Sequence, residues 1–473
     1  MSESPYVCGQ DIPGDAPLPV RARALFASAL QECSIERALK RAIAHSTGIA
    51  TADDRIRGLL LGIDGQQELV RVDLRHLRIL AVGKAAAVML EAVLSDLDLP
   101  PGIDLQGIVI APSLPSSLPE GFQFFAGGHP LPNDASLAGA QAVLDLLAAI
   151  PPAGSPSNSP ETVCLFLLSG GASAMMELSL DPNLSLDDTI GFHRALIHSV
   201  ATIAEINCVR KHFSAVKGGR LAIAASAAAC FSLFVSDVPS HHLDALGSGP
   251  TLPDTTTLDD CRAVLARYDL LPRLPASVQR FFLDPAIPET PKPGDFIPHV
   301  VTLLDGDSLA EAARRQAEQL GFHAVIDNTC DDWDCLAAAD YLLARLRALR
   351  RIHPRVCLIS VGEVTVSIPR NRLLASSVGG RNQHFALYAA TRLQASDGPI
   401  AVLSAGSDGV DGNSPFAGAV VDQRTLENPR LRSEARTALI EFRSTSVLER
   451  VGATICTGPT GNNLRDLRLL LVE

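Results

Sequence analysis

The sequence predicts an α/β protein of two domains, each with a mainly parallel β-sheet flanked by helices. Short apolar segments recur along the chain, end in glycine or polar loops, and lead into helical patterns. The segments are continuously apolar rather than alternating, as expected when helices cover both faces of a sheet. At 473 residues the chain is also too long for a single typical core.

The elements can be placed in order from these runs. We predict strands at residues 77–82, 106–111, 163–168, 231–235, 300–304, 356–361 and 400–404. Helical patterns occupy residues 85–94, the segment from Ser308 through Leu320, and residues 385–393. Ligand sites in parallel sheets lie beyond the carboxyl ends of the strands, and the polar loops fall there.

Proline-rich stretches indicate the connections between these elements. Residues 151–160 are rich in Pro and Ser and read as a surface loop, while residues 272–298 carry seven prolines. We place the domain boundary in the second stretch. The prediction is therefore an N-terminal Rossmann-like α/β domain at residues 1–280 and a C-terminal α/β domain at residues 281–473.

Composition excludes several classes of function. The formal net charge of −12 argues against a nucleic-acid surface, and 4% aromatic residues provide few stacking platforms. The ten cysteines form no C-x-x-C pair and fit reduced thiols. The longest apolar run, at residues 221–235, is too short to span a bilayer. We expect a cytoplasmic protein, a monomer or homodimer, with no membrane or nucleic-acid partner.

A basic segment at residues 207–220 stands out in this acidic chain. It holds four basic side chains and no acidic one: Arg210, Lys211, Lys217 and Arg220. Concentrated positive charge in a cleft attracts anions, and Arg and Lys bind phosphate and carboxylate alike. The alternative is a solvated helix face, and helical spacing cannot place all four cations on one side.

Two glycine turns between a strand and a helix are candidates for holding phosphate. Lys84 follows Gly83 at the start of a helix, where the helix dipole disfavours a cation unless an anion shares the site. The turn at Ser169–Ser173 contains Gly170 and Gly171, whose backbone can approach phosphate closely. The alternatives are an exposed lysine and an ordinary tight turn.

Further strand-end loops carry isolated acids and one arginine. Asp237 ends a strand and is suited either to Mg²⁺ or to accepting a proton, with a turn-forming role as the alternative. Arg381 begins a helix after Gly379 and Gly380, in the manner of Lys84. Other loops of this kind are Gly362–Glu363, Ser407–Gly412 and Gly458–Asn463. Cations and isolated acids on such loops are what phosphoryl transfer with a metal requires.

The ordered series of motifs resembles the type-2 glycerate kinases, whose C-terminal part is called the MOFRL domain. The matching stretches are 83–85, 127–132, 169–171, 207–221, 236–239, 248–251, 379–383, 407–412 and 458–463. The MOFRL-like region would occupy about residues 355–470. The resemblance implies two α/β domains with the active site in the cleft between them. It also implies phosphorylation of D-glycerate with ATP and Mg²⁺, usually at the 2-hydroxyl.

The resemblance also suggests roles for individual residues. The catalytic positions would be Lys84, Asp237, Arg381 and Asp408. Lys84 and Arg381 would neutralise phosphoryl oxygens. Either aspartate would act as base while the other assists the metal. Nucleotide binding would involve Ser169, Gly170, Gly171, Ser173, Asn207, Lys211, Glu363, Gly379 and Gly380.

Three departures from the family pattern are visible. Ala172 replaces the third glycine of the usual Ser-Gly-Gly-Gly-Ser turn, and Val361 and Val364 replace the outer residues of Gly-Gly-Glu-Thr. Ser240-His241-His242 follows Pro239 where the family often has acids. Two other functions stay open: an NAD(P)-dependent hydroxypyruvate reductase, although no G-x-G-x-x-G fingerprint follows a strand, and a non-catalytic sensor of glycerate or nucleotide.

Overall fold

The computed structural model describes residues 16–43, 57–63, 66–72, 74–97, 99, 102–151, 161–369 and 377–473. The chain forms two compact units. The central unit is Ile35–Leu303, and the terminal unit joins Leu304–Glu473 to the N-terminal segment that ends at Ser34. The predicted loop at residues 151–160 lies outside the described residues except for Pro151.

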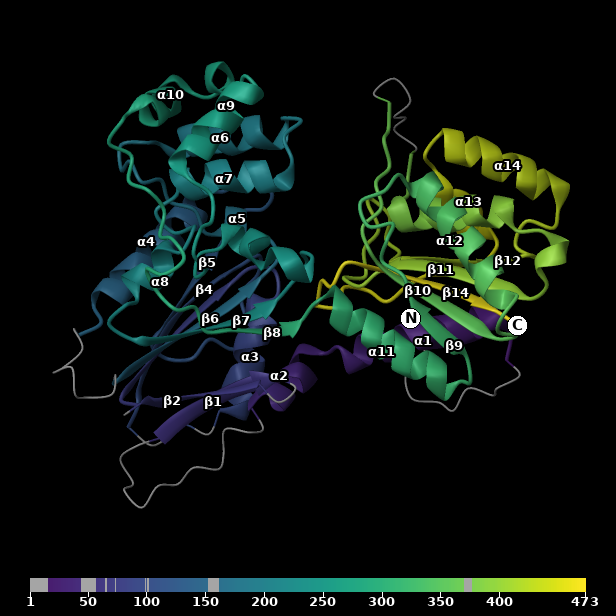
Figure 1. Ribbon diagram of the computed structural model, residues 1–473, viewed down its shortest axis with the longest axis horizontal. Coiled ribbons are helices and arrows are strands. Elements are labelled where there is room, and N and C mark those ends of the chain that lie inside the picture. The colour runs from purple at the N-terminus through teal and green to yellow at the C-terminus, as the bar shows by residue number, and fades with distance from the viewer. Residues whose placement is uncertain are drawn as a thin grey trace. The chain divides into compact units, whose positions relative to one another are not determined.

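The central unit is built on a six-stranded sheet. The strand order is β5-β4-β3-β6-β7-β8, and β3, β4, β5, β6 and β7 pair in parallel (Figure 1). The strands are β3 (His76–Val82), β4 (Asp104–Ala111), β5 (Phe122–Ala126), β6 (Thr162–Ser169), β7 (Ala229–Val235) and β8 (Val300–Leu304). An antiparallel ribbon of β1 (Arg57–Ile63) and β2 (Gln66–Val72) precedes them. The predicted parallel sheet is confirmed here.

Some helices of the central unit pack against this sheet, and others form a second apolar cluster among themselves. Ala140 and Val143 of α4 pack with Phe166 in one core. Phe192, Phe213 and Phe282 from α6, α7 and α10 form a separate apolar cluster. The helices are α2 (Ile35–Ile43), α3 (Ala86–Asp96), α4 (Asp134–Ala148), α5 (Ala172–Met175), α6 (Leu186–Ile197), α7 (Ile203–Phe213), α8 (Arg220–Ala224), α9 (Leu258–Arg267) and α10 (Ala276–Leu283), with 3-10 turns η1 (Ser240–Ser248) and η2 (Leu271–Arg273).

The sheet of the terminal unit corrects the prediction of mainly parallel strands. Its order is β13-β12-β11-β14-β10-β9, and only the β9–β10 pair is parallel among the described strands. The strands are β9 (His323–Ile326), β10 (Val356–Gly362), β11 (Ile400–Gly406), β12 (Gly418–Asp422), β13 (Thr454–Ile455) and β14 (Asp466–Val472). Strand β14, which was not predicted from the sequence, lies antiparallel between β10 and β11. A continuous apolar run shows burial on both faces but carries no strand direction.

Helices cover both faces of the terminal sheet (Figure 1). One face packs against α12 and α13 through residues such as Leu342, Phe385 and Leu470, and the other faces α1 and α11. The helices are α1 (Leu18–Glu32), α11 (Gly306–Gln319), α12 (Cys335–Arg350), α13 (Arg381–Arg392), α14 (Pro429–Ile440) and α15 (Ser444–Arg450), with the turn η4 (Ala395–Asp397). No helix among the described residues is long and apolar enough to cross a membrane.

The division into units differs from the boundary placed after residue 280. The central unit runs on to Leu303, because β8 is the last strand of its sheet. Helix α1 belongs to the terminal unit, where Arg21 donates hydrogen bonds to both carboxylate oxygens of Glu473 at 2.7 and 2.6 Å. A pairing between the two ends of a chain leaves no local sequence signal.

Candidate functional site

The turn that carries Lys84 follows β3 and is hydrogen-bonded to the turn that follows the neighbouring parallel strand, β6. The Lys84 amide donates to the Gly170 carbonyl at 2.9 Å, and the Ala85 amide donates to Ser169 Oγ at 3.0 Å. Gly83 has φ +119°, and a Cβ there would lie 2.4 Å from Ser169 Oγ. Glycine is therefore required at position 83, and Lys84 stands exposed beside the second glycine turn.

Three polar side chains surround the Gly170–Gly171 turn. A Cβ on Gly170 would lie 2.0 Å from Asp237 Oδ2, so the aspartate rests against this backbone. A Cβ on Gly171 would lie 3.2 Å from His129 Cδ2 and 3.3 Å from Lys84 Cγ. The structure thus brings together Lys84, the glycine turn and Asp237, as the sequence predicted, and adds His129.

The Ala172 departure leaves this turn intact. Gly171 adopts the left-handed conformation, with φ +84°, and ends the turn, while Ala172 is the first residue of α5. Its side chain is buried, and it would meet a Cβ added at Gly247 at 3.2 Å. Because a helical position does not need glycine, the alanine preserves the backbone path.

Asn207 is connected to the same turn by a short hydrogen-bonded chain. Helix α7 begins with a capping box in which the Thr202 and Glu205 side chains satisfy each other's amides. One turn further, Asn207 Oδ1 accepts from Ser248 Oγ at 3.0 Å. Ser248 Oγ lies 2.5 Å from Ser173 Oγ. The predicted positions Asn207 and Ser173 therefore meet through Ser248.

Two lysines of the basic segment are committed to internal ion pairs. Lys211 is 2% exposed and contacts Asp244 at 2.8 Å and Asp254 at 3.2 Å. Lys217 is fully buried and pairs with Glu177 at 2.8 Å. The geometry favours a structural role for both lysines, although Lys211 was predicted to bind nucleotide.

The buried Glu177 organises charge beneath the glycine turn. Its Oε2 also lies 2.7 Å from His193 Nε2. Burial alone would raise the pKa of Glu177, but Lys217 and His193 outweigh burial and lower the pKa to about 2. The carboxylate stays ionised and holds the chain after α5 in place, since Lys217 Nζ also donates to the Met176 carbonyl at 3.0 Å.

Arg210 and His129 belong to the same electrostatic environment as Lys84. Burial lowers the pKa of His129, and the charges of Lys84 and Arg210 lower the pKa further. His129 lies in the motif at residues 127–132, but no role was assigned to the histidine from the sequence. Its position after a strand and a glycine pair was the available signal.

In the terminal unit, Arg381 is held by two carboxylates. Its guanidinium donates to Asp466 from Nε at 2.5 Å and from Nη2 at 3.1 Å, and Nη2 lies 2.9 Å from Glu363 Oε1. Burial would lower the pKa of Arg381, but the hydrogen bonds and charge of Asp466 raise the pKa above its ordinary value. The structure brings Glu363 and Arg381, two predicted site residues, into contact, whereas Asp466 was missed with strand β14.

A buried aspartate, Asp411, caps the helix that begins at Arg381. Its Oδ1 accepts from the Asn382 amide at 3.0 Å and its Oδ2 from the Gln383 amide at 2.8 Å. A Cβ on Gly380 would lie 2.2 Å from Asp411 Oδ1, which explains that glycine. Asp411 therefore fixes the first turn of α13.

Asp408 lies on a partly exposed loop joined to a second glycine loop. Its Oδ1 accepts from the Val410 amide at 3.0 Å, and its carbonyl accepts from the Thr460 amide at 3.2 Å. A Cβ on Gly409 would meet the Gly458 carbonyl oxygen at 1.9 Å. The predicted loops Ser407–Gly412 and Gly458–Asn463 thus form one structure.

The Val361 and Val364 departures are accommodated by the core. Val361 is buried in β10, and Val364 packs in the apolar cluster of the terminal unit. The glycine between them is retained: Gly362 has φ +138°, and a Cβ there would lie 2.5 Å from Asp331 Oδ1.

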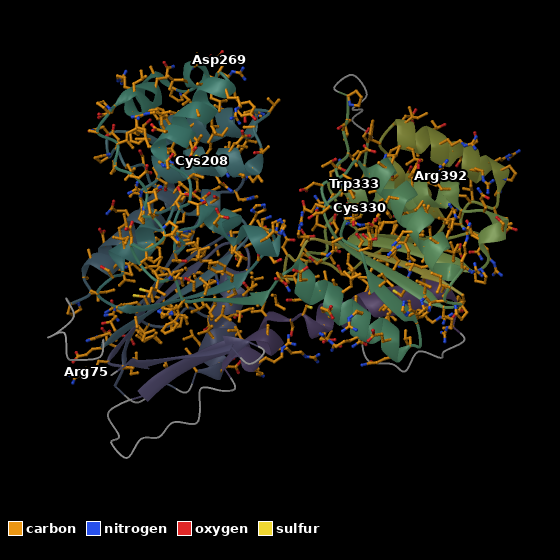
Figure 2. All side chains as sticks on the ribbon, in the orientation of Figure 1. Arg75, Cys208, Asp269, Cys330, Trp333 and Arg392 are labelled. Atoms are coloured by element: carbon orange, nitrogen blue, oxygen red, sulfur yellow. The ribbon has the colours of Figure 1, made fainter. Side chains whose placement is uncertain are left out.

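The two predicted metal ligands belong to different units. Asp237 belongs to the central unit and Asp408 to the terminal unit. Among the described residues, no group of three or more His, Cys, Asp or Glu side chains is arranged to hold a metal ion. Cys330 and Cys335 are buried beside Ser360 and the Arg381 carbonyl, and Figure 2 labels Cys330 near Trp333 in the loop before α12.

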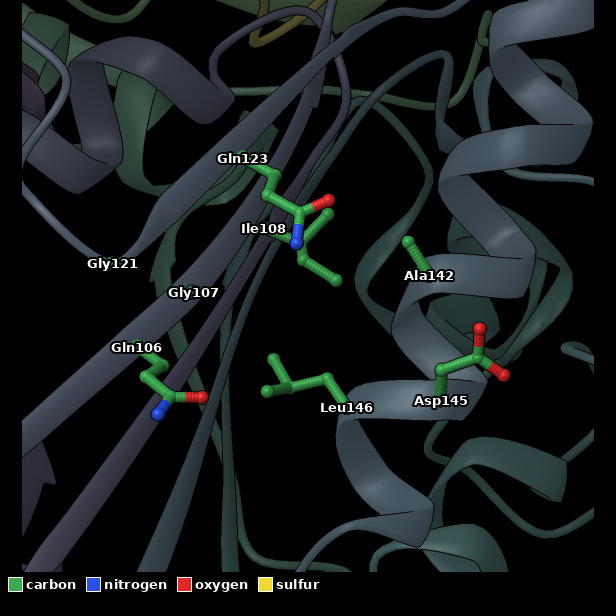
Figure 3. Close-up of a pocket in the computed structure, with 8 residues that line it drawn as sticks. All are labelled: Gln106, Gly107, Ile108, Gly121, Gln123, Ala142, Asp145 and Leu146. Atoms are coloured by element: carbon green, nitrogen blue, oxygen red, sulfur yellow. The ribbon is translucent and has the colours of Figure 1, made fainter.

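A separate cavity of about 200 Å³ lies between β4, β5 and α4 (Figure 3). Two glutamines and Asp145 supply its polar groups, and no cation lines it. The lining residues are Gln106, Gly107, Ile108, Gly121, Gln123, Ala142, Asp145 and Leu146. Gln106 and Gly121 stand near the starts of their strands, at the opposite end of the sheet from the glycine turns, so this cavity is distinct from the candidate site.

The fold and the site first define a class: an α/β protein in which a lysine, an aspartate and two glycine turns meet at the carboxyl edge of a parallel sheet. Comparison with known proteins gives the family. Residues 21–283 match the family model described as a domain of unknown function, DUF4147, and residues 356–466 match the MOFRL family.

Named relatives and one solved structure cover most of the chain. The D-glycerate 2-kinase of Thermotoga maritima is 34% identical over 86% of this chain and 93% of its own. A putative hydroxypyruvate reductase of Agrobacterium vitis is 33% identical over 83% of this chain and 86% of its own. The crystal structure of a glycerate kinase from T. maritima superimposes with a TM-score of 0.78 at 29% identity, covering 96% of this chain and 99% of that one. The chain belongs to the glycerate kinase family.

Proposed function

We propose that this protein is a glycerate 2-kinase, which transfers the γ-phosphoryl group of ATP to the 2-hydroxyl of D-glycerate. The observation that carries the proposal is the convergence of Lys84, His129 and Asp237 on the Gly170–Gly171 turn. Backbone amides at a glycine turn with an adjacent lysine suit a phosphate group. The names of the glycerate kinase relatives indicate glycerate as the acceptor of the phosphoryl group.

Each residue has a role set by its charge. Lys84 neutralises oxygens of the transferring phosphoryl group, whose charge redistributes in the transition state. Asp237, held against Gly170, is placed either to accept the proton of the substrate hydroxyl or to bind the metal. Arg381 and Asp408 would act from the terminal unit, and the location of the site in a cleft between the domains stays a prediction.

The residues fit Mg²⁺ bound mainly by substrate phosphates. In kinases Mg²⁺ commonly uses one or two carboxylates plus phosphate oxygens and water, so a cluster of three protein ligands is not required. Asp237 beside the phosphate turn, or Asp408, would hold the ion. When bound, Mg²⁺ supplies charge neutralisation for the phosphate chain.

A coupled assay tests this proposal and its alternatives. The purified protein with ATP, Mg²⁺ and D-glycerate should release ADP, and enolase without phosphoglycerate mutase should then yield phosphoenolpyruvate. A requirement for the mutase would refute the 2-hydroxyl assignment. Oxidation of NADH with hydroxypyruvate would establish the reductase instead, and ligand binding without turnover would indicate a sensor.

A further inference from the structure

In the described part of the chain, Arg210 and Arg220 are the two cations of the basic segment that form no ion pair with a carboxylate, and Arg220 donates instead to the Pro288 and Glu289 carbonyls at 3.1 and 3.4 Å. Arg210 lies in the last turn of α7, where the helix dipole favours positive charge. The Arg210 side chain makes one long hydrogen bond, from Nη1 to Asn207 Oδ1 at 3.5 Å, within the described structure. Within the part of the chain that the structure describes, Arg210 makes no ion pair, and its buried Nε has no hydrogen-bond partner.

Burial makes this arrangement costly unless a ligand completes it. Burial lowers the pKa of the Arg210 guanidinium, and only the charge of Glu177 opposes that effect. Glu177 is already committed, because its Oε2 contacts Lys217 and His193 and its Oε1 accepts from the Leu178 amide at 3.0 Å. A partly buried guanidinium with free donors is suited to an incoming anion.

A hydrogen-bonded chain connects Arg210 with the glycine turn beside which Lys84 lies. The charges of both residues lower the pKa of His129. Asn207, which contacts Arg210, is joined through Ser248 to Ser173 on the glycine turn. The side of the site formed by α7 is therefore continuous with the phosphate turn.

We propose that Arg210 binds the carboxylate of the acceptor and so determines its specificity for a 2-hydroxy acid. The inference rests on the proposed function. In such an acid the carboxylate and the reacting hydroxyl stand on adjacent carbons, so the cation for the carboxylate must adjoin the cation for the phosphoryl group. Lys84 takes the phosphoryl group, and Arg210 is connected to the same glycine turn through Asn207, Ser248 and Ser173. The planar fork of a guanidinium matches a carboxylate with two parallel hydrogen bonds.

Two substitutions of Arg210 separate acceptor binding from nucleotide binding. Arg210→Met keeps much of the apolar stem and removes the charge, whereas Arg210→Lys keeps the charge and loses the fork. Calorimetry should show D-glycerate affinity reduced on the order of a hundredfold in Arg210→Met and roughly tenfold in Arg210→Lys. ATP affinity should stay within about twofold. Arg194→Met, at an exposed position on α6, is the matched control and should leave both affinities unchanged.

Turnover with a neutral polyol gives an independent readout. The ratio of turnover with D-glycerate to turnover with glycerol should be much smaller in Arg210→Met than in the wild type. Glycerol has no carboxylate, so the loss of Arg210 should lower turnover with D-glycerate alone. Unchanged D-glycerate affinity in a folded Arg210→Met or Arg210→Lys variant would overturn the inference, as would a loss confined to ATP. If the wild type binds D-glycerate through Arg210 but does not phosphorylate it, the proposed function fails and this inference reduces to a binding site.

Discussion

Arg381 and Asp466 form a two-point ion pair, with Nε at 2.5 Å from one carboxylate oxygen and Nη2 at 3.1 Å from the other. Asp466 is 1% exposed, so the pair is anchored in the protein interior. Arg381 is thus neutralised within its own unit rather than standing as a free cation. Arg381 would bind a phosphate through the guanidinium N–H groups that Asp466 and Glu363 do not already occupy.

This pairing changes what substitution of Arg381 should do. Arg381→Ala would leave Asp466 buried without its partner, and we expect a loss of about 2 kcal/mol of stability because the arginine is partly exposed. Arg381→Lys keeps a charge for Asp466 and should retain most of the stability, while kcat falls because the planar fork is lost. Thermal unfolding and steady-state kinetics on both variants measure the two effects separately. Full kcat in a folded Arg381→Lys variant would remove Arg381 from catalysis.

Lys84 should show the opposite behaviour, a kinetic effect without a stability effect. It is exposed, so Lys84→Ala should change stability little. Loss of a preorganised donor typically costs on the order of 3 kcal/mol, and kcat should fall roughly a hundredfold with a much smaller change in KM. Lys40→Ala, at another exposed lysine, is the control. Near-normal turnover in Lys84→Ala would show that Lys84 is an ordinary surface lysine.

Much of the central unit could be predicted because its signals are local. The strands ending near Val82, Leu168 and Val235 are largely apolar runs that lead into loops with glycine or aspartate within two residues, and the structure confirms them. Strand β14 was missed although it is itself a largely apolar run, and its antiparallel place between β10 and β11 has no local signal because these partners lie far away in sequence. Loss of β14 also hid Asp466, which became visible only once the strand order was known.

The basic segment shows the same limit at the level of single residues. Sequence places four cations within residues 207–220 but cannot say which are paired. Pairing depends on Glu177, Asp244 and Asp254, which arrive from other segments and neutralise Lys211 and Lys217. In the described structure neither Arg210 nor Arg220 pairs with a carboxylate, and Arg220 donates instead to two backbone carbonyls.

The buried carboxyl of Asp411 should make stability depend on pH. Burial raises its pKa from 3.8 to about 6, against the opposing hydrogen bonds from Asn382 and Gln383. Between these values the folded state binds more protons than the unfolded state, so the contribution of Asp411 to stability falls as pH rises from about 4 to 6. The loss is on the order of 3 kcal/mol at most.

Denaturant unfolding of wild type and Asp411→Asn at several pH values measures this contribution. The difference between the two proteins should vary between about pH 4 and pH 6 and become constant above that range. Taking the difference removes groups such as Glu177, whose lowered pKa acts at lower pH. A difference that does not vary with pH would show that Asp411 ionises normally.

The glycine turn gives a paired test of backbone requirements. In Gly170→Ala the new Cβ would lie 2.0 Å from Asp237 Oδ2, so the aspartate must move and kcat should drop by about tenfold or more. In Ala172→Gly the change falls within α5 and should cost about 1 kcal/mol of stability while leaving kcat close to wild type. The kcat and the melting temperature of both variants test these two expectations. A large kcat gain in Ala172→Gly would mean that the alanine distorts the phosphate turn after all.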